Sequence, residues 1–293
     1  MTANGKCIIC INAVLTGVNY LFVAKTHSAT AVALAQLDNE FFVLKKSSLQ
    51  LNVFDAISFT LRGSMTIPNV FYVCNFVDMV ACSFHNCLYI ANAQSGCIIR
   101  LEMPSACKQW EVEGFQGNDA VISVTSSHHV LVVCDRSDKL RLFSTNGVLH
   151  KTVKLPSDLV NVTSAVELIP DQYVVTHGRF TAGLHRVCVI NGEGKMLHTF
   201  GGFQGSHPKL LNSPSDVVVD KDGFVYVDDE GNNRLIVLTQ ELDYIHCMSS
   251  IFKTSDYCVR RRMKLNKQLG FIYVSHTEYQ GNSSTWYTTM FKI

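Results

Sequence analysis

Three aspartates, Asp78, Asp119 and Asp216, are the residues of this sequence whose type and position could support metal-dependent chemistry. Each lies close to the start of an apolar run with the alternation of a strand. Three converging carboxylates could bind Ca²⁺ or activate a water molecule. They do not stand at one common distance from those runs, however, and aspartate also caps turns that precede strands. A metal-dependent hydrolase or lyase is therefore the second alternative function, and we expect no catalytic residue, metal or other cofactor.

A second group of candidates is basic, and its densest part lies between residues 258 and 264. Clustered Lys and Arg side chains bind phosphate by displacing counterions. On a strand these side chains would point to alternating faces, so at most two could act together. The predicted loops near them carry more acidic than basic residues, which favours a protein partner over RNA. The candidate binding residues are Arg260, Arg261, Arg262, Lys264, Arg179 and His177.

Composition limits the possible partners and the compartment. The chain has 293 residues, 17% of them charged, and a net charge of +1. No bulk field attracts nucleic acid or anionic lipid, and no uncharged apolar run is long enough to span a membrane. The 11 cysteines are scattered, mostly inside apolar segments where a free thiol packs as a small hydrophobic side chain. This pattern predicts a cytoplasmic protein rather than a secreted disulfide framework.

Cys7 and Cys10 have the spacing of half a zinc site. A structural zinc needs four ligands, and the next cysteine is Cys74. We therefore interpret this pair as part of a strand.

The elements that must position these residues are repeated, and residues 216–238 show the unit most clearly. Apolar strands at 217–219 and 224–227 flank Asp222-Gly223, a dipeptide typical of a tight type I′ hairpin. A polar turn and two further strands complete a four-stranded antiparallel meander. The core of the second strand recurs about every 46 residues, ending at Val43, Ile90, Val133, Val175, Val227 and Val274.

Six such units predict an all-β fold, a six-bladed β-propeller of four-stranded antiparallel blades. One unit cannot bury both faces of its sheet, whereas six sheets packed radially cover one another. The last unit lacks its outer strand, so we expect the N-terminal segment, within residues 5–25, to join that blade and close the ring. Residues 1–293 then form one domain, with a closing strand and lead-in at 1–29 and blades at roughly 30–64, 76–114, 119–155, 163–201, 214–249 and 257–293.

The fifth unit resembles the NHL repeat, whose name records an Asn-His-Leu triplet. The corresponding triplet is Asn233-Arg234-Leu235, preceded by Pro214-Ser-Asp216 and by Asp222-Gly223. The resemblance is specific for roughly residues 160–293 and rests on periodicity before them. It is to the C-terminal propeller of tripartite-motif NHL proteins and their invertebrate relatives.

The motif residues have structural tasks in this interpretation. Asp220 and Asp222 cap the turn that contains Gly223. Asp228 or Asp229 pairs with Arg234 across the next hairpin, where Asn233 tolerates a left-handed conformation. The motif therefore indicates the fold and not a reaction.

The resemblance implies a non-catalytic scaffold that binds a partner protein, as a substrate-recognition module in a ubiquitin-ligase context. No RING, B-box or coiled coil is visible in these residues, so we do not expect the chain itself to transfer ubiquitin. The longer predicted loops contain Phe71, Tyr72, Phe76 and Phe203, and aromatic side chains suit an interface. An RNA-binding propeller that acts in post-transcriptional regulation is the first alternative.

Overall fold

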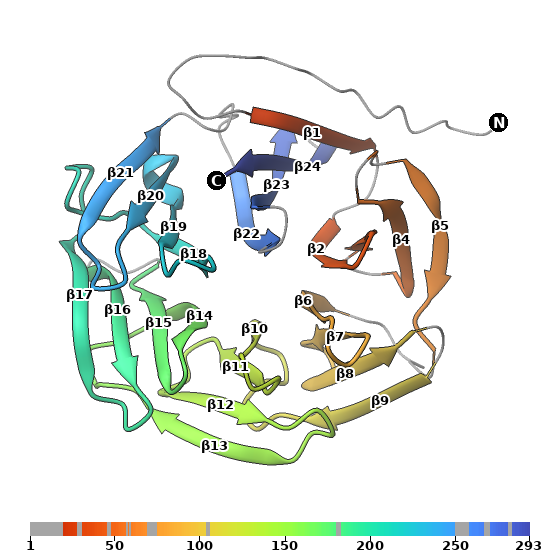
Figure 1. The fold of residues 1–293 in the computed structure, drawn as a ribbon, viewed down its shortest axis with the longest axis horizontal. Helices are drawn as coiled ribbons and strands as arrows, with labels where there is room; N and C mark the ends of the chain where they lie inside the picture. Colours follow the sequence, from red (N-terminus) through yellow and green to blue (C-terminus); the bar gives the residue numbers. More distant parts are fainter. Residues whose placement is uncertain are drawn as a thin grey trace.

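The computed structural model describes residues 20–27, 31–45, 48–56, 58, 60–68, 75–103, 106–179, 183–249, 258–266, 270–280 and 283–293. They form six four-stranded antiparallel sheets around a central axis (Figure 1). The predicted all-β, six-bladed propeller is therefore confirmed. One 3₁₀ turn, η1 (Glu230–Asn232), interrupts the strands, and the described residues include no helix that could cross a membrane.

The blades follow one another along the chain. Blade 1 contains β2 (Ala31–Leu37), β3 (Glu40–Lys45), β4 (Gln50–Asp55) and β5 (Leu61–Thr66), and blade 2 contains β6 (Phe76–Cys82), β7 (Cys87–Asn92), β8 (Cys97–Glu102) and β9 (Ala106–Glu111). Blade 3 contains β10 (Ala120–Val124), β11 (Val130–Cys134), β12 (Lys139–Phe143) and β13 (Leu149–Lys154), and blade 4 contains β14 (Val162–Ile169), β15 (Gln172–His177), β16 (Leu184–Asn191) and β17 (Met196–Phe203). Blade 5 contains β18 (Pro214–Val219), β19 (Val225–Asp229), β20 (Arg234–Leu238) and β21 (Tyr244–Ser249), and blade 6 contains β22 (Cys258–Asn266), β23 (Phe271–Gln280), β24 (Ser283–Lys292) and β1 (Tyr20–His27).

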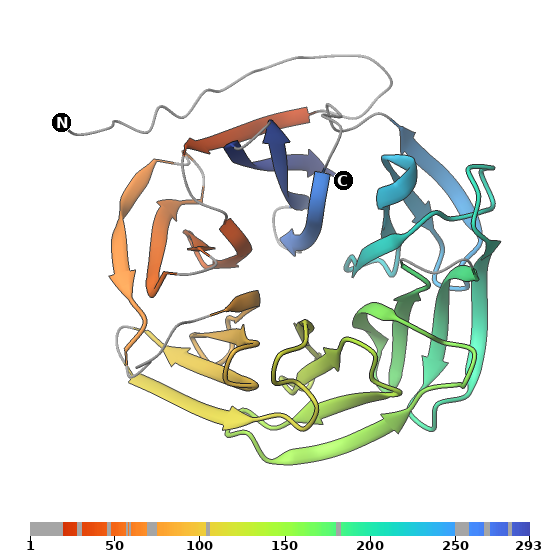
Figure 2. The same cartoon turned by 180° about the vertical axis from the view of Figure 1, so that it is seen from behind.

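The ring has two different faces. In blades 1 to 5 the chain runs from an inner strand at the axis to an outer strand at the rim, and in blade 6 it runs outward from β22 to β24 (Figures 1 and 2). We call the face that carries the second-to-third loops and the crossings between blades the loop face. The opposite face, with the first-to-second and third-to-fourth turns, is the turn face.

The two ends of the described chain close the ring within one blade. Strand β1 pairs antiparallel with β24, for example Val23 opposite Thr289, and becomes the outer strand of blade 6 (Figure 1). This confirms the expected closure, although the strand begins at Tyr20 and ends at His27, later than the 5–25 segment suggested. Cys7 and Cys10 lie outside the described residues.

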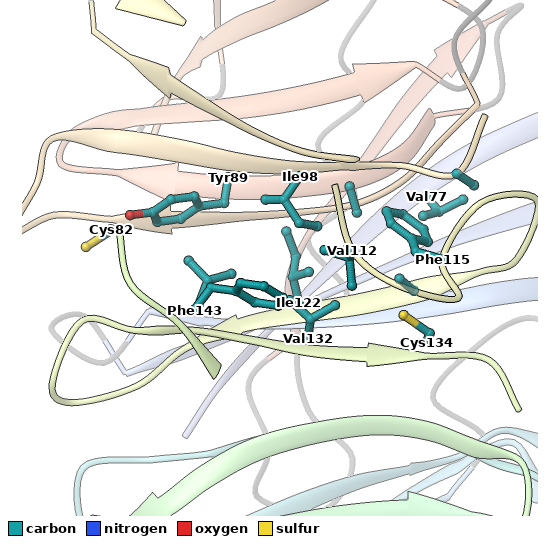
Figure 3. Close-up of a cluster of buried hydrophobic side chains, with 14 of the residues drawn as sticks. Val77, Cys82, Tyr89, Ile98, Val112, Phe115, Ile122, Val132, Cys134 and Phe143 are labelled. Atoms are coloured by element: carbon teal, nitrogen blue, oxygen red, sulfur yellow. The ribbon is translucent and has the colours of Figure 1, made fainter. Parts of the chain in front are cut away.

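The core consists of apolar clusters between neighbouring blades. All residues of β7 and all residues of β11 are buried, because a sheet inside the ring is covered on both faces. Figure 3 shows the cluster between blades 2 and 3, where Tyr89 and Ile98 of one blade face Ile122 and Val132 of the next. Continuous apolar runs in the second strands are the consequence of this double burial.

A register shift recurs near the start of the inner strand. It occurs in five of the blades, before Ala33, Asp78, Ser164, Asp216 and Arg262. An extra residue in one strand re-aims the side chains that follow it. Asp78 and Asp216 therefore do occupy equivalent positions, contrary to the sequence spacing, because the turns that follow their strands differ in length.

The turn in the opening repeat differs from the expected type I′ hairpin. Gly223 has a φ of +87°, whereas Asp222 is not among the residues with positive φ. Asp220 donates its N–H to the Phe224 carbonyl at 3.0 Å, and its side chain accepts the N–H groups of Asp222 and Phe224, both at 2.9 Å. The strand pairing thus resumes at Val225, and Phe224 belongs to the turn.

Removing β1 should open the ring and destabilise it. A variant that lacks residues 1–27 loses a ladder of hydrogen bonds worth about 1 kcal/mol each. In a chain of this size, each kcal/mol of lost stability lowers the midpoint of thermal unfolding by about 2–4 °C. We expect the midpoint of thermal unfolding to fall by roughly 10 °C or more. Truncation of residues 1–19, which retains β1, is the matched control, and an equal midpoint for both truncations would contradict the closure.

Candidate functional site on the propeller axis

The inner strands enclose a cavity of about 390 Å³ on the axis. Its wall includes residues from the inner strands of all six blades: Gln36, Val80, Ile122, Glu167, Asp216 and Lys264. Asp38 and Ser83, from first-to-second turns, also line it, so the cavity extends toward the turn face. If this propeller catalysed a reaction in its central channel, the reacting groups would be expected to line this axial cavity.

Asp78 is completely buried beside this cavity and connects three blades. One carboxylate oxygen accepts the N–H of Met79 in its own strand at 2.8 Å. The other accepts the N–H of Ile122, on the inner strand of blade 3, at 2.9 Å. Lys264 of blade 6 places its Nζ 3.0 Å from Asp78 Oδ1, reaching past blade 1, which lies between them (Figure 1).

Asp216 repeats this arrangement in blade 5. Its carboxylate accepts the N–H of Val217 at 2.9 Å, the N–H of Met263 in blade 6 at 2.8 Å and the hydroxyl of Ser164 in blade 4 at 2.6 Å. Burial raises the pKa of Asp216, while Arg262 and Lys264 act in the opposite direction. All three contacts donate to the carboxylate, so the site is built for its ionised form.

The polar side chains of the inner strands around the cavity therefore form contacts that join blades. Ser123 of blade 3 donates to the Ala165 carbonyl of blade 4 at 3.0 Å. Between blades 6 and 1, Asn266 and Tyr273 both contact the Gln36 side-chain oxygen, at 2.7 and 3.0 Å. Within the described ranges, no three His, Cys, Asp or Glu side chains are grouped so that they could hold a metal ion.

Asp119, the third carboxylate, lies elsewhere. It lines a separate pocket of about 230 Å³ on the loop face together with Arg179, Arg262, Asp135 and Arg136. The structure thus brings Asp119, Arg179 and Arg262 together but keeps Asp78, Asp216 and Lys264 in the axial layer below. Val121 lines both hollows, so the loop-face pocket and the axial cavity lie back to back.

Three arginines on the described part of the loop face have acidic partners. Arg179 contacts Glu230 at 2.7 Å, and Arg136 lies 3.8 Å from Asp135. Arg186 contacts Asp158. Phosphate binding relies on Lys and Arg in excess of nearby acids, so this pattern favours a surface of mixed charge. Arg260 and Arg261 belong to β22, and their side chains lie outside the described part of the chain.

His177 is a buried side chain and not an exposed binding group. It is fully enclosed, and its Nε2 accepts a hydrogen bond from Arg186 Nε at 3.1 Å. Burial, followed by the positive charge of Arg186, lowers the pKa of His177 to about 4. The imidazole is therefore neutral at physiological pH and holds Arg186 in place.

The aromatic residues predicted to lie in the longer loops differ in their exposure. Phe76 is completely buried in β6, whereas Phe203 at the end of β17 is 73% exposed. Val160, in the crossing before β14, is a second exposed apolar side chain on this face. Phe71 and Tyr72 lie outside the described residues.

The contacts of the repeat residues in blade 5 are structural, because they stabilise a loop. Asp229, and not Asp228, contacts Arg234, at 2.6 Å. The Arg234 guanidinium also donates to the carbonyls of Ser206, His207 and Leu210. Asp228 accepts the Ser215 hydroxyl at 2.7 Å. Asn233 has a φ of +51°, and Asp222 contacts the neighbouring Lys221 on the surface.

Several residues of this site were absent from the sequence-based candidates. Ser164 and Ser123 join blades, and Glu230 neutralises Arg179. A small polar or acidic residue early in three of the inner strands (Asp78, Ser164 and Asp216) is the sequence signal that could have pointed to Ser164.

Comparisons with known proteins agree with this architecture. A model of the NHL repeat matches residues 211–238, which span β18 to β20. No curated protein matches the chain. The molecule is thus a six-bladed propeller with an NHL repeat in blade 5.

Solved structures with a similar fold come from proteins of different kinds. A virginiamycin B lyase from Staphylococcus aureus has a TM-score of 0.58 at 8% identity, over 91% of this chain and 98% of that chain. A chain from a nidogen/laminin complex has a TM-score of 0.58 at 12% identity, over 75% and 80%. A protein of unknown function from Bacteroides caccae has a TM-score of 0.52 at 14% identity, over 81% and 84%. At these identities the likeness shows the fold alone.

The contact between Lys264 and Asp78 across the axis should be detectable in a double-mutant cycle. Lys264→Met and Asp78→Asn each leave a polar partner without its counterpart and should lower the free energy of unfolding by about 2–4 kcal/mol. The double variant should cost less than the sum, with a coupling on the order of 1–3 kcal/mol in urea unfolding. The exposed pair Lys221→Met and Asp222→Asn is the control, with no measurable coupling expected. Strict additivity at Lys264 and Asp78 would contradict the contact.

His177 should make stability depend on pH. Because its folded pKa of about 4 lies below the ordinary value of 6.5, its contribution is complete above pH 6.5 and is lost as the pH falls toward 4. His177→Gln retains an acceptor for Arg186 but does not titrate. Between pH 7.5 and pH 5, urea unfolding of the variant should lose about 2 kcal/mol less stability than the parent protein. Equal losses would show that His177 is not held neutral.

Proposed function

We propose that this chain is a non-catalytic propeller that binds a partner protein on its loop face. The observation that carries the proposal is the pairing of Arg136, Arg179 and Arg186 with carboxylates on the face that holds a pocket of about 230 Å³. A polar rim of mixed charge is typical of protein interfaces. Binding of a nucleic-acid backbone would instead call for a majority of unpaired cations.

Exposed apolar side chains on the same face support this proposal. Phe203, which is 73% exposed, lies at the loop-face end of blade 4. Val160, also exposed, lies in the crossing that precedes this blade. An exposed aromatic side chain is a common energetic centre of an interface. We therefore infer a partner that inserts an ionised side chain into the loop-face pocket and packs apolar surface on Phe203.

The contacts on the axis also favour binding over catalysis. Asp78 and Asp216 use their oxygens to accept backbone and hydroxyl groups of other blades. A general base or a metal ligand must keep an oxygen available for the reacting group. As an extension of this proposal, the partner would be a substrate that the chain presents to a ubiquitin ligase.

Quantitative capture from extracts of the source cells tests this function. Phe203→Ser combined with Arg136→Ser changes two exposed loop-face residues and should reduce the captured partner roughly tenfold or more. Val148→Ser is the matched control, because Val148 is 67% exposed but lies in a turn on the turn face. Nuclease treatment should leave capture unchanged.

Two results would overturn the proposal. Release of all captured proteins by nuclease would favour the RNA-binding alternative. Loss of the partner in Val148→Ser, with retention in the loop-face variant, would place the binding surface on the opposite side.

A further inference from the structure

Two cysteines face each other on the turn face of blade 2. Cys82 ends β6, Cys87 begins β7, and the two are direct partners across the antiparallel pair. Both are free thiols, buried at the base of a turn whose residues Ser83, Phe84 and Asn86 are exposed. Direct antiparallel partners have Cα atoms about 4.5–5.5 Å apart, which lies inside the range of about 4.4–6.8 Å that a disulfide accepts. The backbone of this hairpin therefore places the two sulfur atoms within reach of a covalent bond.

A histidine in the intervening turn distinguishes the two thiols. Nδ1 of His85 lies 3.3 Å from the sulfur of Cys82. Phe84, which is 72% exposed, stacks on His128 of the next blade with ring centroids 4.0 Å apart and packs edge-on against His85. These rings fix the turn, so the imidazole stays beside Cys82.

The electrostatics agree with this geometry. A hydrogen bond from the Cys87 thiol, together with the contact to His85, lowers the pKa of Cys82 to about 5. The same hydrogen bond and burial raise the pKa of Cys87. Cys134 is a natural comparison, since it lies at the other end of the same apolar cluster (Figure 3) and burial raises its pKa to about 11.

We propose that Cys82 and Cys87 form a dithiol site that reacts with hydroperoxides, in which Cys82 is the nucleophile and Cys87 the resolving thiol. His85 stabilises the thiolate by donating from its ring nitrogen. This site lies on the turn face, away from the loop-face pocket, and does not depend on the partner proposed above.

The reaction consumes one hydrogen peroxide. The Cys82 thiolate attacks one peroxide oxygen, the O–O bond breaks, and the departing hydroxide takes up a proton as water, which leaves a sulfenic acid on Cys82. Cys87 then attacks the Cys82 sulfur, the S–O bond breaks, and the hydroxide leaves as water with the Cys87 proton. Both sulfur atoms are oxidised, peroxide is reduced, and two water molecules and one disulfide result.

Formation of the disulfide between Cys82 and Cys87 can be assayed directly on the full chain. Phe84 lies between the two cysteines, so chymotrypsin separates their peptides unless a disulfide joins them. After treatment with hydrogen peroxide and blocking with N-ethylmaleimide, mass spectrometry should find the Cys82 and Cys87 peptides linked, with Cys134 alkylated or intact. Absence of this link, or oxidation of Cys134 at the same rate, would overturn the proposal.

Three variants assign the roles. Cys87→Ser should accumulate a sulfenic acid on Cys82 that dimedone traps, whereas Cys82→Ser should leave Cys87 unoxidised. In His85→Gln, disulfide formation at pH 7 should slow and then accelerate as the pH rises, because loss of the His85 contact raises the pKa of Cys82 and protonates more of its thiol at neutrality. The parent protein should show a flat rate from pH 6 to 8. Circular dichroism checks that each variant is folded, and equal rates and pH profiles for His85→Gln and the parent would remove His85 from the mechanism.

Discussion

The structure depends on buried carboxylates that accept backbone N–H groups from a neighbouring blade. An inner strand has no further strand on its axial side, so N–H groups on that edge need another acceptor. Asp78 supplies one to Ile122 and Asp216 supplies one to Met263, each across a boundary between blades. Lys264 lies 3.0 Å from Asp78 and lowers the cost of burying this charge. Sheets that could otherwise slide on apolar surfaces are thereby held at a defined register at the boundaries of blades 2 and 3 and of blades 5 and 6.

This constraint also decides where function can reside. The side chains of the axial layer join the blades to one another, so interactions with other molecules are expected on the two faces. The loop face carries Arg179, whose charge Glu230 balances, and the exposed ring of Phe203. The turn face carries the hairpin in which Cys82 and Cys87 are paired. Similar folds occur in a lyase and in a complex of nidogen with laminin, so the fold is shared by proteins of different kinds.

Periodicity predicted the fold because it depends only on local pattern: apolar second strands, turn residues and an incomplete last unit defined the blades and their closure by β1. The candidate site could be predicted only in part. The equivalence of Asp78 and Asp216 was hidden by turns of unequal length and by the register shift before each residue. The burial of His177 follows from its contact with Arg186 across two strands, and the pairing of cysteines follows from register. Such contacts depend on the register between neighbouring strands and leave no periodic signal in one sequence.

Amide hydrogen exchange of Ile122 and Met263 would show whether the buried carboxylates join the blades. Both N–H groups lie on inner strands at the axis, where the account assigns each a buried carboxylate as acceptor. They should exchange only through global unfolding, as slowly as the amides in the middle of β11. Exchange of either amide at the rate of the surface turns, with the remaining core protected, would show that the carboxylates do not hold the blades together.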